Sequence, residues 1–200
     1  MNWDGLFVAT HRDVYEPSDD TFLLARVVGD LVQPGECFIE VGCGTGLVSL
    51  VAARKGASAI CTDRNPYAAA IAKANASENR LQLDVLIADL LSGLTVDADW
   101  VVFNPPYLPT APDEHVEGPL DWAFDGGPDG NQVALRFADQ VAELRPRNVL
   151  VIHSSLSDPR PLLDRMAVAG YDHEVAADER LPYERLFVRR FERKRGNNAH

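Results

Sequence analysis

Apolar and polar positions repeat along the chain with two periods. The short apolar runs are rich in valine, isoleucine and aromatic residues and end at turn-forming residues, which is typical of buried strands. The longer runs place apolar residues three or four positions apart, which is typical of helices. This pattern predicts strands over 37–41, 58–62, 83–88, 100–103, 148–153, 171–177 and 186–191. It predicts helices over 22–32, 47–55, 65–78, 132–144 and 159–169.

The alternation of strands and helices predicts one doubly wound α/β domain over residues 1–200. Nearly continuous apolar strands are typical of a parallel sheet with helices on both faces. Ser18, followed by Asp19 and Asp20, has the composition of a helix N-terminus, and Asn65-Pro66 has that of another. We expect an N-terminal helical segment over 1–35 and a flexible tail over 193–200.

The stretch 104–130 carries no strand or helix pattern and is rich in proline and glycine. Irregular segments of this length in compact domains usually serve function or are disordered. Within it, Asp113-Glu114-His115 has the composition of a catalytic cluster, but a solvated loop is the interpretation we favour. Trp122 and Phe124 are candidates to line a substrate cleft or to pack the loop onto the domain.

Composition narrows the choice of partners. The chain of 200 residues has 19 basic and 30 acidic side chains, a net charge of −11, which argues against broad capture of a nucleic-acid backbone. The segment 189–195 carries a net charge of +4, and we interpret it as a solvated tail rather than an RNA-binding patch. No signal peptide or membrane-spanning run is recognisable. The three cysteines and five histidines lack metal-ligand spacing, so we expect a cytoplasmic protein without its own metal.

A glycine-rich loop, Glu40-Val41-Gly42-Cys43-Gly44-Thr45-Gly46, lies between the first predicted strand of the sheet and its helix. Glycines at such a turn allow positive φ angles and a close approach of the backbone to a ligand. The loop lies at the carboxyl end of a strand, where open α/β sheets bind ligands. Its G-x-G-x-G spacing differs from the G-x-G-x-x-G of dinucleotide-binding proteins, so a dinucleotide is not predicted.

Together with Asp63 and Asp89, which end the next two strands, this loop resembles that of class I S-adenosylmethionine-dependent methyltransferases. The resemblance implies a seven-stranded Rossmann-like sheet, mostly parallel with one antiparallel strand. It also implies that the glycine loop accommodates the methionine part of the cofactor. Asp63 would then hold the ribose hydroxyls and Asp89 the adenine amine, which suits the strong acceptor character of carboxylates.

The tetrapeptide Asn104-Pro105-Pro106-Tyr107 follows the fourth strand of the predicted sheet. Its two prolines fix an extended backbone and remove two N–H donors. The groups left to meet a substrate are acceptors, namely the Asn104 side-chain carbonyl and the Pro105 backbone carbonyl, which match the two donors of a planar NH2 group. Tyr107 supplies an aromatic wall. The motif resembles that of amino-methyltransferases, which act on conjugated nitrogens, where catalysis comes largely from positioning.

The segment 14–24 and these motifs together resemble the short archaeal and eukaryotic members of the HemK family of protein glutamine-N5 methyltransferases. The resemblance implies, as substrate, the glutamine of the Gly-Gly-Gln motif in a class 1 translation release factor. It also implies a small zinc-binding activator subunit that forms a heterodimer and covers an apolar edge of the sheet. By position, Asn104, Pro105 and Tyr107 would hold the glutamine amide. The residues implied in cofactor binding are Thr21, Glu40, Gly42, Gly44, Gly46, Asp63, Asp89, Leu90 and Asn104.

Two alternatives stay open at the level of sequence. The same tetrapeptide occurs in nucleic-acid adenine-N6 methyltransferases, which would be favoured by a basic surface and a target-recognition domain. A non-catalytic binding protein that retains the cofactor fold is the second alternative. Loss of Asn104 or Asp63 would favour that alternative, and both residues are present.

Overall fold

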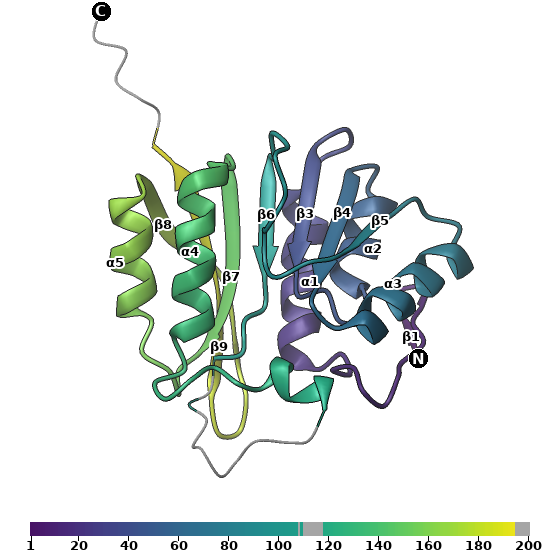
Figure 1. Ribbon diagram of the computed structural model, residues 1–200, viewed down its shortest axis with the longest axis horizontal. Helices are drawn as coiled ribbons and strands as arrows, with labels where there is room; N and C mark the ends of the chain where they lie inside the picture. Colours follow the sequence, from purple (N-terminus) through teal and green to yellow (C-terminus); the bar gives the residue numbers. More distant parts are fainter. Residues whose placement is uncertain (108, 110–117, 195–200) are drawn as a thin grey trace, which may run out of the picture.

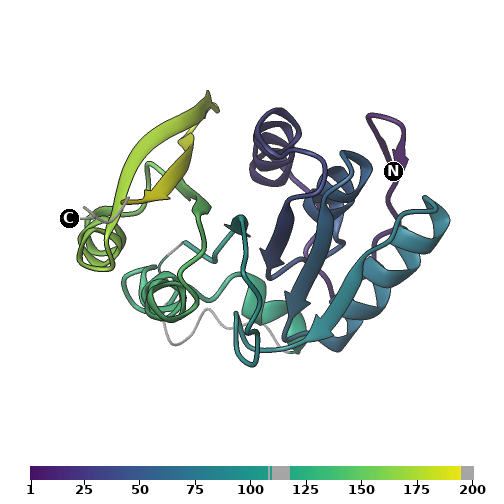
Figure 2. The ribbon, with the colours of Figure 1, turned by 90° about the horizontal axis from the view of Figure 1, so that it is seen from above.

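The computed structural model describes residues 1–107, 109 and 118–194. A central sheet with helices on both faces forms the domain (Figures 1 and 2). Its strands are β3 (Cys37–Val41), β4 (Ser58–Asp63), β5 (Asp84–Ile87), β6 (Trp100–Phe103), β7 (Asn148–Ser154), β8 (Tyr171–Arg180) and β9 (Arg185–Arg193). The helices are α1 (Asp19–Leu31), α2 (Leu47–Arg54), α3 (Pro66–Glu78), α4 (Gln132–Leu144), α5 (Arg160–Val168) and the 3₁₀ helix η1 (Pro119–Ala123).

The strand order is β5-β4-β3-β6-β7-β9-β8. Every neighbouring pair is parallel except those of β9, which runs antiparallel to both β7 and β8. The prediction of a seven-stranded sheet with one antiparallel strand is therefore confirmed. Because the strand order reverses between β3 and β6, the loops after these strands diverge and leave space for a ligand at the carboxyl edge.

The two faces of the sheet are buried separately. On β3, Phe38 contributes to one core with α1 and α2, while Ile39 and Val41 contribute to a second core with α4 and α5. This alternation follows from the two-residue period of a strand. The same alternation places Glu40 on the face covered by α2. The helices therefore anchor the sheet from both sides and leave its carboxyl edge free for the site.

The N-terminal segment differs from the helical prediction. It begins with a small hairpin of β1 (Asn2–Trp3) and β2 (Leu6–Phe7), and only Asp19–Leu31 is helical. Side chains of α3 and its C-cap hold the hairpin, because the Asn79 and Asn75 side-chain oxygens accept from the backbone N–H groups of Phe7 at 2.9 Å and of Ala9 at 2.8 Å. Ser18 lies at the N-cap of α1 without a side-chain capping bond, whereas the Asn65 side chain caps α3 as expected.

The interpretation of 189–195 as a solvated tail is wrong for its first five residues. Arg189, Arg190 and Arg193 belong to β9, and the Lys194 backbone N–H still donates to the Gly170 carbonyl at 2.9 Å. Arg190 donates to Asn148 and lies over the Trp100 ring, 5.5 Å from its centroid. Long arginine stems can cover apolar surface in this way, so a run of cations is compatible with a strand. Residues 195–200 lie outside the described part of the chain.

Among the described residues, no helix is long and apolar enough to cross a membrane.

Candidate active site

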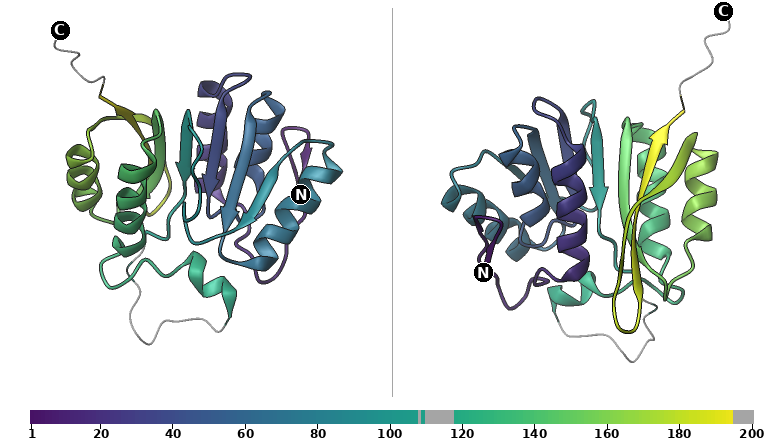
Figure 3. Two further views of the ribbon diagram at one scale, coloured as in Figure 1. Left: turned by 45° about the horizontal axis from the view of Figure 1, so that its top comes forward. Right: turned by 180° about the vertical axis from the view of Figure 1, so that it is seen from behind.

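A cavity of about 380 Å³ lies at the carboxyl edge of the parallel strands. The loops after β3, β4, β5 and β6 form its floor, and the start of α1, η1 and the start of α4 form its walls. Figure 3 shows that η1 and the turn between β8 and β9 both extend beyond this edge. Ten of the residues predicted from the sequence line the cavity: Thr21, Glu40, Gly42, Gly44, Asp63, Asp89, Leu90, Asn104, Pro105 and Tyr107.

The glycine loop has the backbone conformation that its composition predicts. Gly42 and Gly44 have φ angles of +62° and +53°, and a Cβ at Gly42 would lie 3.2 Å from the Phe103 ring. Gly46 has a φ of +80° but does not line the cavity. A Cβ there would lie 2.9 Å from the Ala72 Cβ. We conclude that Gly42 and Gly44 shape the cavity, whereas Gly46 allows the turn that begins α2 to approach α3 at Ala72.

Glu40 is almost completely buried between β3 and α2. Its Oε2 accepts hydrogen bonds from the backbone N–H, at 2.8 Å, and the hydroxyl of Ser49. Burial raises the pKa of Glu40 to about 8, although the hydrogen bonds from Ser49 oppose the change. The carboxyl group therefore changes its charge near neutral pH, which distinguishes it from a surface glutamate.

The two aspartates at the strand ends have different surroundings. Asp63 accepts from the backbone N–H groups of Gly44 at 2.9 Å and Asn65 at 2.8 Å. Burial raises the Asp63 pKa, and these two hydrogen bonds oppose that change. Asp89 is about half exposed and forms an ion pair with Arg136 on α4. The next residue, Leu90, has a φ of +55°, an uncommon backbone conformation that is found more often at functional sites.

The tetrapeptide after β6 ends in a network centred on Asp20. The Asn104 Nδ2 donates to the Asp20 carboxylate at 2.9 Å, and the Tyr107 hydroxyl donates to it at 3.4 Å. The Asn104 Oδ1 is buried and has no hydrogen-bond partner among the described residues. A buried acceptor without a partner costs free energy, and so such atoms at a cavity wall indicate the place of a ligand donor. Asn104, which lines the cavity, therefore holds one buried acceptor that no protein group satisfies.

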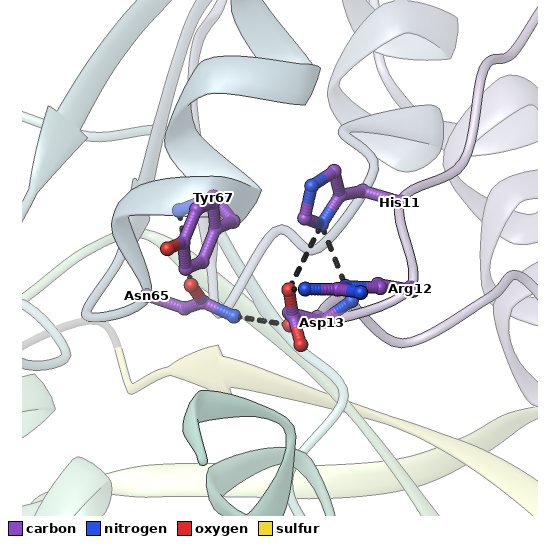
Figure 4. A network of polar contacts seen from close by, with 5 residues as sticks. All are labelled: His11, Arg12, Asp13, Asn65 and Tyr67. Carbon is purple, nitrogen blue, oxygen red and sulfur yellow. Dashed lines mark hydrogen bonds and ion pairs between the residues drawn. The ribbon is translucent and has the colours of Figure 1, made fainter.

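A second polar network ties the N-terminal loop to the turn after β4 (Figure 4). The Asn65 Nδ2 donates to the Asp13 carbonyl at 2.7 Å, while its Oδ1 accepts from the Tyr67 backbone N–H at 3.0 Å. The His11 Nδ1 accepts from the Asp13 backbone N–H at 3.2 Å, and the His11 ring stacks on Tyr67. Since Asn65 also contacts Asp63, this network fixes the N-terminal loop against the cavity wall.

Two aromatic contacts place η1 over the cavity. The Arg64 guanidinium lies over the Trp122 ring, 4.1 Å from its centroid, and Phe124 meets Tyr15 edge-on at 5.7 Å between ring centres. Both Trp122 and Phe124 line the cavity and both contact side chains of the domain, which agrees with both interpretations made from the sequence. The other proposed cluster, 113–115, lies outside the described residues.

Three residues that matter to the geometry do not stand out as site residues in the sequence: Asp20, Ser49 and Arg136. In the sequence, Asp20 is recognisable only as an acidic residue at a helix N-terminus. A signal is available, because Asp20 occupies the same helical stripe as Leu23, Leu24, Val27 and Val28, which are buried. An acid on an apolar stripe requires partners. Ser49 and Arg136 have no comparable signal, because their roles depend on how the helices dock.

The cavity fits S-adenosylmethionine by the chemistry of its walls. The carboxyl groups of Glu40, Asp63 and Asp89 line the cavity and supply acceptors for hydroxyl and amino groups. Gly42 lines the cavity and has no side chain, and a Cβ added there would crowd the Phe103 ring. The backbone at Gly42 is therefore accessible to a ligand. Asn104, whose Oδ1 has no hydrogen-bond partner, lines the same cavity as these groups.

The comparisons with known proteins agree with this arrangement. Residues 18–115 match the family model described as "Methyltransferase small domain". A Methanocaldococcus jannaschii protein, whose name assigns it to the protein N5-glutamine methyltransferases, is 36% identical over 188 residues, covering 92% of this chain and 94% of its own. "Methyltransferase HEMK2" of Mus musculus is 36% identical over 193 residues, covering 90% of each chain.

A solved structure has the same fold. It is the E. cuniculi Mtq2-Trm112 complex, which is described as responsible for the methylation of the eRF1 translation termination factor. The match covers 91% of this chain and 99% of that chain, with a TM-score of 0.74 and 24% sequence identity. At this identity the similarity concerns the fold.

Proposed function

The chain belongs to the protein N5-glutamine methyltransferase family, and on this premise we propose that it methylates the glutamine of the Gly-Gly-Gln motif in a class 1 translation release factor. S-adenosylmethionine is the methyl donor. The products are N5-methylglutamine and S-adenosylhomocysteine. A nitrogen–carbon bond forms, a sulfur–carbon bond breaks with its electron pair remaining on sulfur, and one proton leaves the amide nitrogen.

The unpaired Oδ1 of Asn104 is the observation that supports this substrate most directly. An amide NH2 group offers two donors, and the Asn104 Oδ1 and Pro105 carbonyl are acceptors on one short segment of the cavity wall. Accepting both hydrogens orients the nitrogen, and positioning of this kind supplies much of the rate when the nucleophile is a poor one. Tyr107 lines the same wall and limits the movement of a flat group.

A nucleic-acid adenine amine would satisfy the same two acceptors. The net charge of the chain is therefore the property that distinguishes a protein substrate from a nucleic-acid substrate. With a net charge of −11, the chain is poorly suited to hold a phosphate backbone. At the cavity, the described arginines are engaged with protein groups: Arg136 pairs with Asp89, and Arg64 lies over Trp122. These observations favour a protein substrate over DNA.

The test is methyl transfer from labelled S-adenosylmethionine to three substrates: release factor, the same factor with its motif glutamine replaced by glutamate, and an adenine-containing duplex. We expect label only on the first. Label on the duplex and none on the release factor would contradict the proposal.

The Asn104→Ala variant tests the role of the amide in the same assay. Because it removes the Oδ1 acceptor and leaves the glycine loop intact, we expect the transfer rate to fall by about 100-fold or more, with S-adenosylhomocysteine still bound. Binding is measured by calorimetry. Unchanged transfer by the Asn104→Ala variant would refute the role of this amide.

We also propose that a small activator subunit binds at the β5 edge of the sheet, as the family resemblance implies. Strand β5 lies at the end of the strand order and pairs only with β4 among the described strands. Its side chains Leu86 and Ile87 are exposed, the latter to 66%. An exposed apolar edge strand is a template for pairing with another chain, and proteins usually cover such an edge. The opposite edge strand, β8, has five charged residues among its ten.

The zinc of the complex would belong to the partner in this proposal. Elemental analysis of the purified chain and of its complex with the partner tests this assignment. We expect zinc in the complex in proportion to the partner and none in the chain alone. Zinc that copurifies with the isolated chain would contradict it.

A further inference from the structure

Asp20 is a buried carboxylate at the start of α1, only 5% exposed, and it joins segments far apart in the sequence. It accepts from the Thr21 backbone N–H at 2.6 Å and from the Asn104 Nδ2 at 2.9 Å, across 84 positions of the chain. The hydroxyls of Thr21, Tyr15 and Tyr107 approach it at 3.2 to 3.4 Å. In every hydrogen bond between the Asp20 carboxylate and the other described residues, Asp20 is the acceptor.

This environment decides which way the Asn104 amide points. A side-chain amide has a donor end and an acceptor end, and the orientation must be inferred from its partners. A carboxylate accepts, so the Nδ2 of Asn104 is the end that faces Asp20. The Oδ1 end is therefore left for the substrate. The Asn104 side chain alone specifies no orientation, because either end fits the same volume.

We propose that Asp20 is a positioning residue for methyl transfer, which holds the Asn104 amide with its oxygen available to the substrate nitrogen. The proposal rests on the proposed function for the identity of the substrate. Asp20 acts through Asn104 and Tyr107, so its role differs from that of the groups that hold the methyl donor. Asp20, at the start of α1, would in this way make the site select a substrate with an amide NH2 group over one with a carboxylate.

Replacing Asp20 with asparagine has a defined structural consequence. The Thr21 N–H is a backbone donor with a fixed direction, so it keeps the one oxygen of the new side chain. The NH2 end of that side chain then faces position 104. The Asn104 amide must turn to offer its oxygen to this donor, which leaves its own NH2 at the cavity. Two NH2 groups then face each other when glutamine enters, whereas a carboxylate becomes acceptable.

The experiment compares wild type, Asp20→Asn and the control Asp19→Asn, which removes the same charge from the adjacent, exposed residue. For Asp20→Asn we expect kcat on a Gly-Gly-Gln peptide to fall by about 100-fold, as misplacement of a reacting group does. The affinity for S-adenosylhomocysteine should fall by less than kcat, because Asp20 contacts Thr21 and Asn104 but not the glycine loop. Asp19→Asn should behave as wild type in both measurements.

A competition experiment supplies a readout that loss of stability would not change. Wild type should bind the Gly-Gly-Gln peptide in preference to its Gly-Gly-Glu counterpart, and Asp20→Asn should lose or reverse this preference. A folded Asp20→Asn variant with wild-type kcat and wild-type peptide preference would overturn the proposal. Equal weakening of both peptides with the preference intact would also overturn it.

Nuclear magnetic resonance separates failure of this inference from failure of the proposed function. The side-chain NH2 signal of Asn104, identified by its absence in Asn104→Ala, should exchange slowly with water in wild type and faster in Asp20→Asn. This measurement requires no substrate. If wild type transfers no methyl group to glutamine but shows this difference, the proposed function fails and the orienting role of Asp20 stands. If exchange is the same in both proteins, the orienting role fails.

Discussion

At the scale of single residues, the site is organised by buried polar groups whose partners come from distant parts of the chain. The motif residues Gly42, Asp63 and Asn104 could be predicted from sequence, because each has a recognisable position at a strand end. Asp20 and Ser49 could not be assigned roles in this way. Their partners are Asn104 and Glu40, respectively, and these contacts form only when a helix packs on the sheet. The pattern of apolar and polar residues predicts local structure and does not indicate such long-range contacts.

Glu40 makes the stability of the fold depend on pH. Its pKa of about 8 in the folded chain lies above the ordinary value of 4.5, because the carboxyl is buried. Between these values the folded state holds a proton that the unfolded state has lost, so stability falls as pH rises. The contribution changes by about 1.4 kcal/mol per pH unit within that window. Glu40→Gln removes this contribution, and urea unfolding at pH 5.5 and 8.5 measures it.

We expect Glu40→Gln to gain stability relative to wild type as the pH increases from 5.5 to 8.5. The pKa of Asp63 is also raised, but Asp63 is present in both proteins and its contribution largely cancels. A difference in unfolding free energy that is the same at both pH values would contradict the prediction.

At the scale of elements, local patterns predict the seven strands of the main sheet and the five α-helices, with ends that differ by a few residues. The hairpin of β1 and β2 is not predictable in this way, since each strand has only two residues and depends on Asn75 and Asn79. Helix η1 is hidden because it lies inside a segment rich in proline and glycine. The arginines of β9 are misleading because a run of positive charge near the end of the chain resembles a solvated tail. In each case tertiary contacts override the local signal.

Gly46 should matter for the close approach of the turn before α2 to α3 more than for ligand binding. An alanine there would adopt a φ near +80° and place its Cβ 2.9 Å from the Ala72 Cβ. Gly35 is a matched control, because its φ is +84° and a Cβ added there would meet nothing within 4 Å. The left-handed backbone alone costs about 1–2 kcal/mol. We expect Gly35→Ala to lose about that much and Gly46→Ala about 1–3 kcal/mol more.

Urea denaturation of both glycine variants measures the two losses. Equal losses would show that the neighbouring Ala72 yields without cost, contrary to the prediction.

At the scale of the whole molecule, the two edges of the sheet differ in chemistry. Strand β8 at one edge has five charged residues among ten and exposes one large apolar side chain, Val175. Strand β5 at the other edge has one charged residue among four and exposes Leu86 and Ile87. The family resemblance implied an apolar edge without identifying it. Strand order identifies it, and strand order depends on long-range pairing that the sequence pattern does not reveal.

Ile87 tests the proposed activator surface. We expect Ile87→Asp to weaken binding of the activator by at least about 10-fold, because the change places a charge in an apolar contact. Val168→Asp is the control, since Val168 is also an exposed apolar residue, 88% accessible, but lies at the end of α5. Calorimetric titration of each variant with the activator measures the effect. If both substitutions weaken binding equally, or neither does, the partner binds elsewhere.

The unpaired oxygen of Asn104 also bears on how the protein could be redesigned. A buried acceptor without a partner costs the free protein about 1–3 kcal/mol, and an incoming donor recovers that energy on binding. A procedure that ranks substitutions by the stability of the isolated chain therefore penalises this atom and favours its removal. Thermostabilised variants obtained in this way would lose recognition of the amide first. Excluding positions 20 and 104 from such a search keeps the hydrogen-bond pattern that the substrate completes.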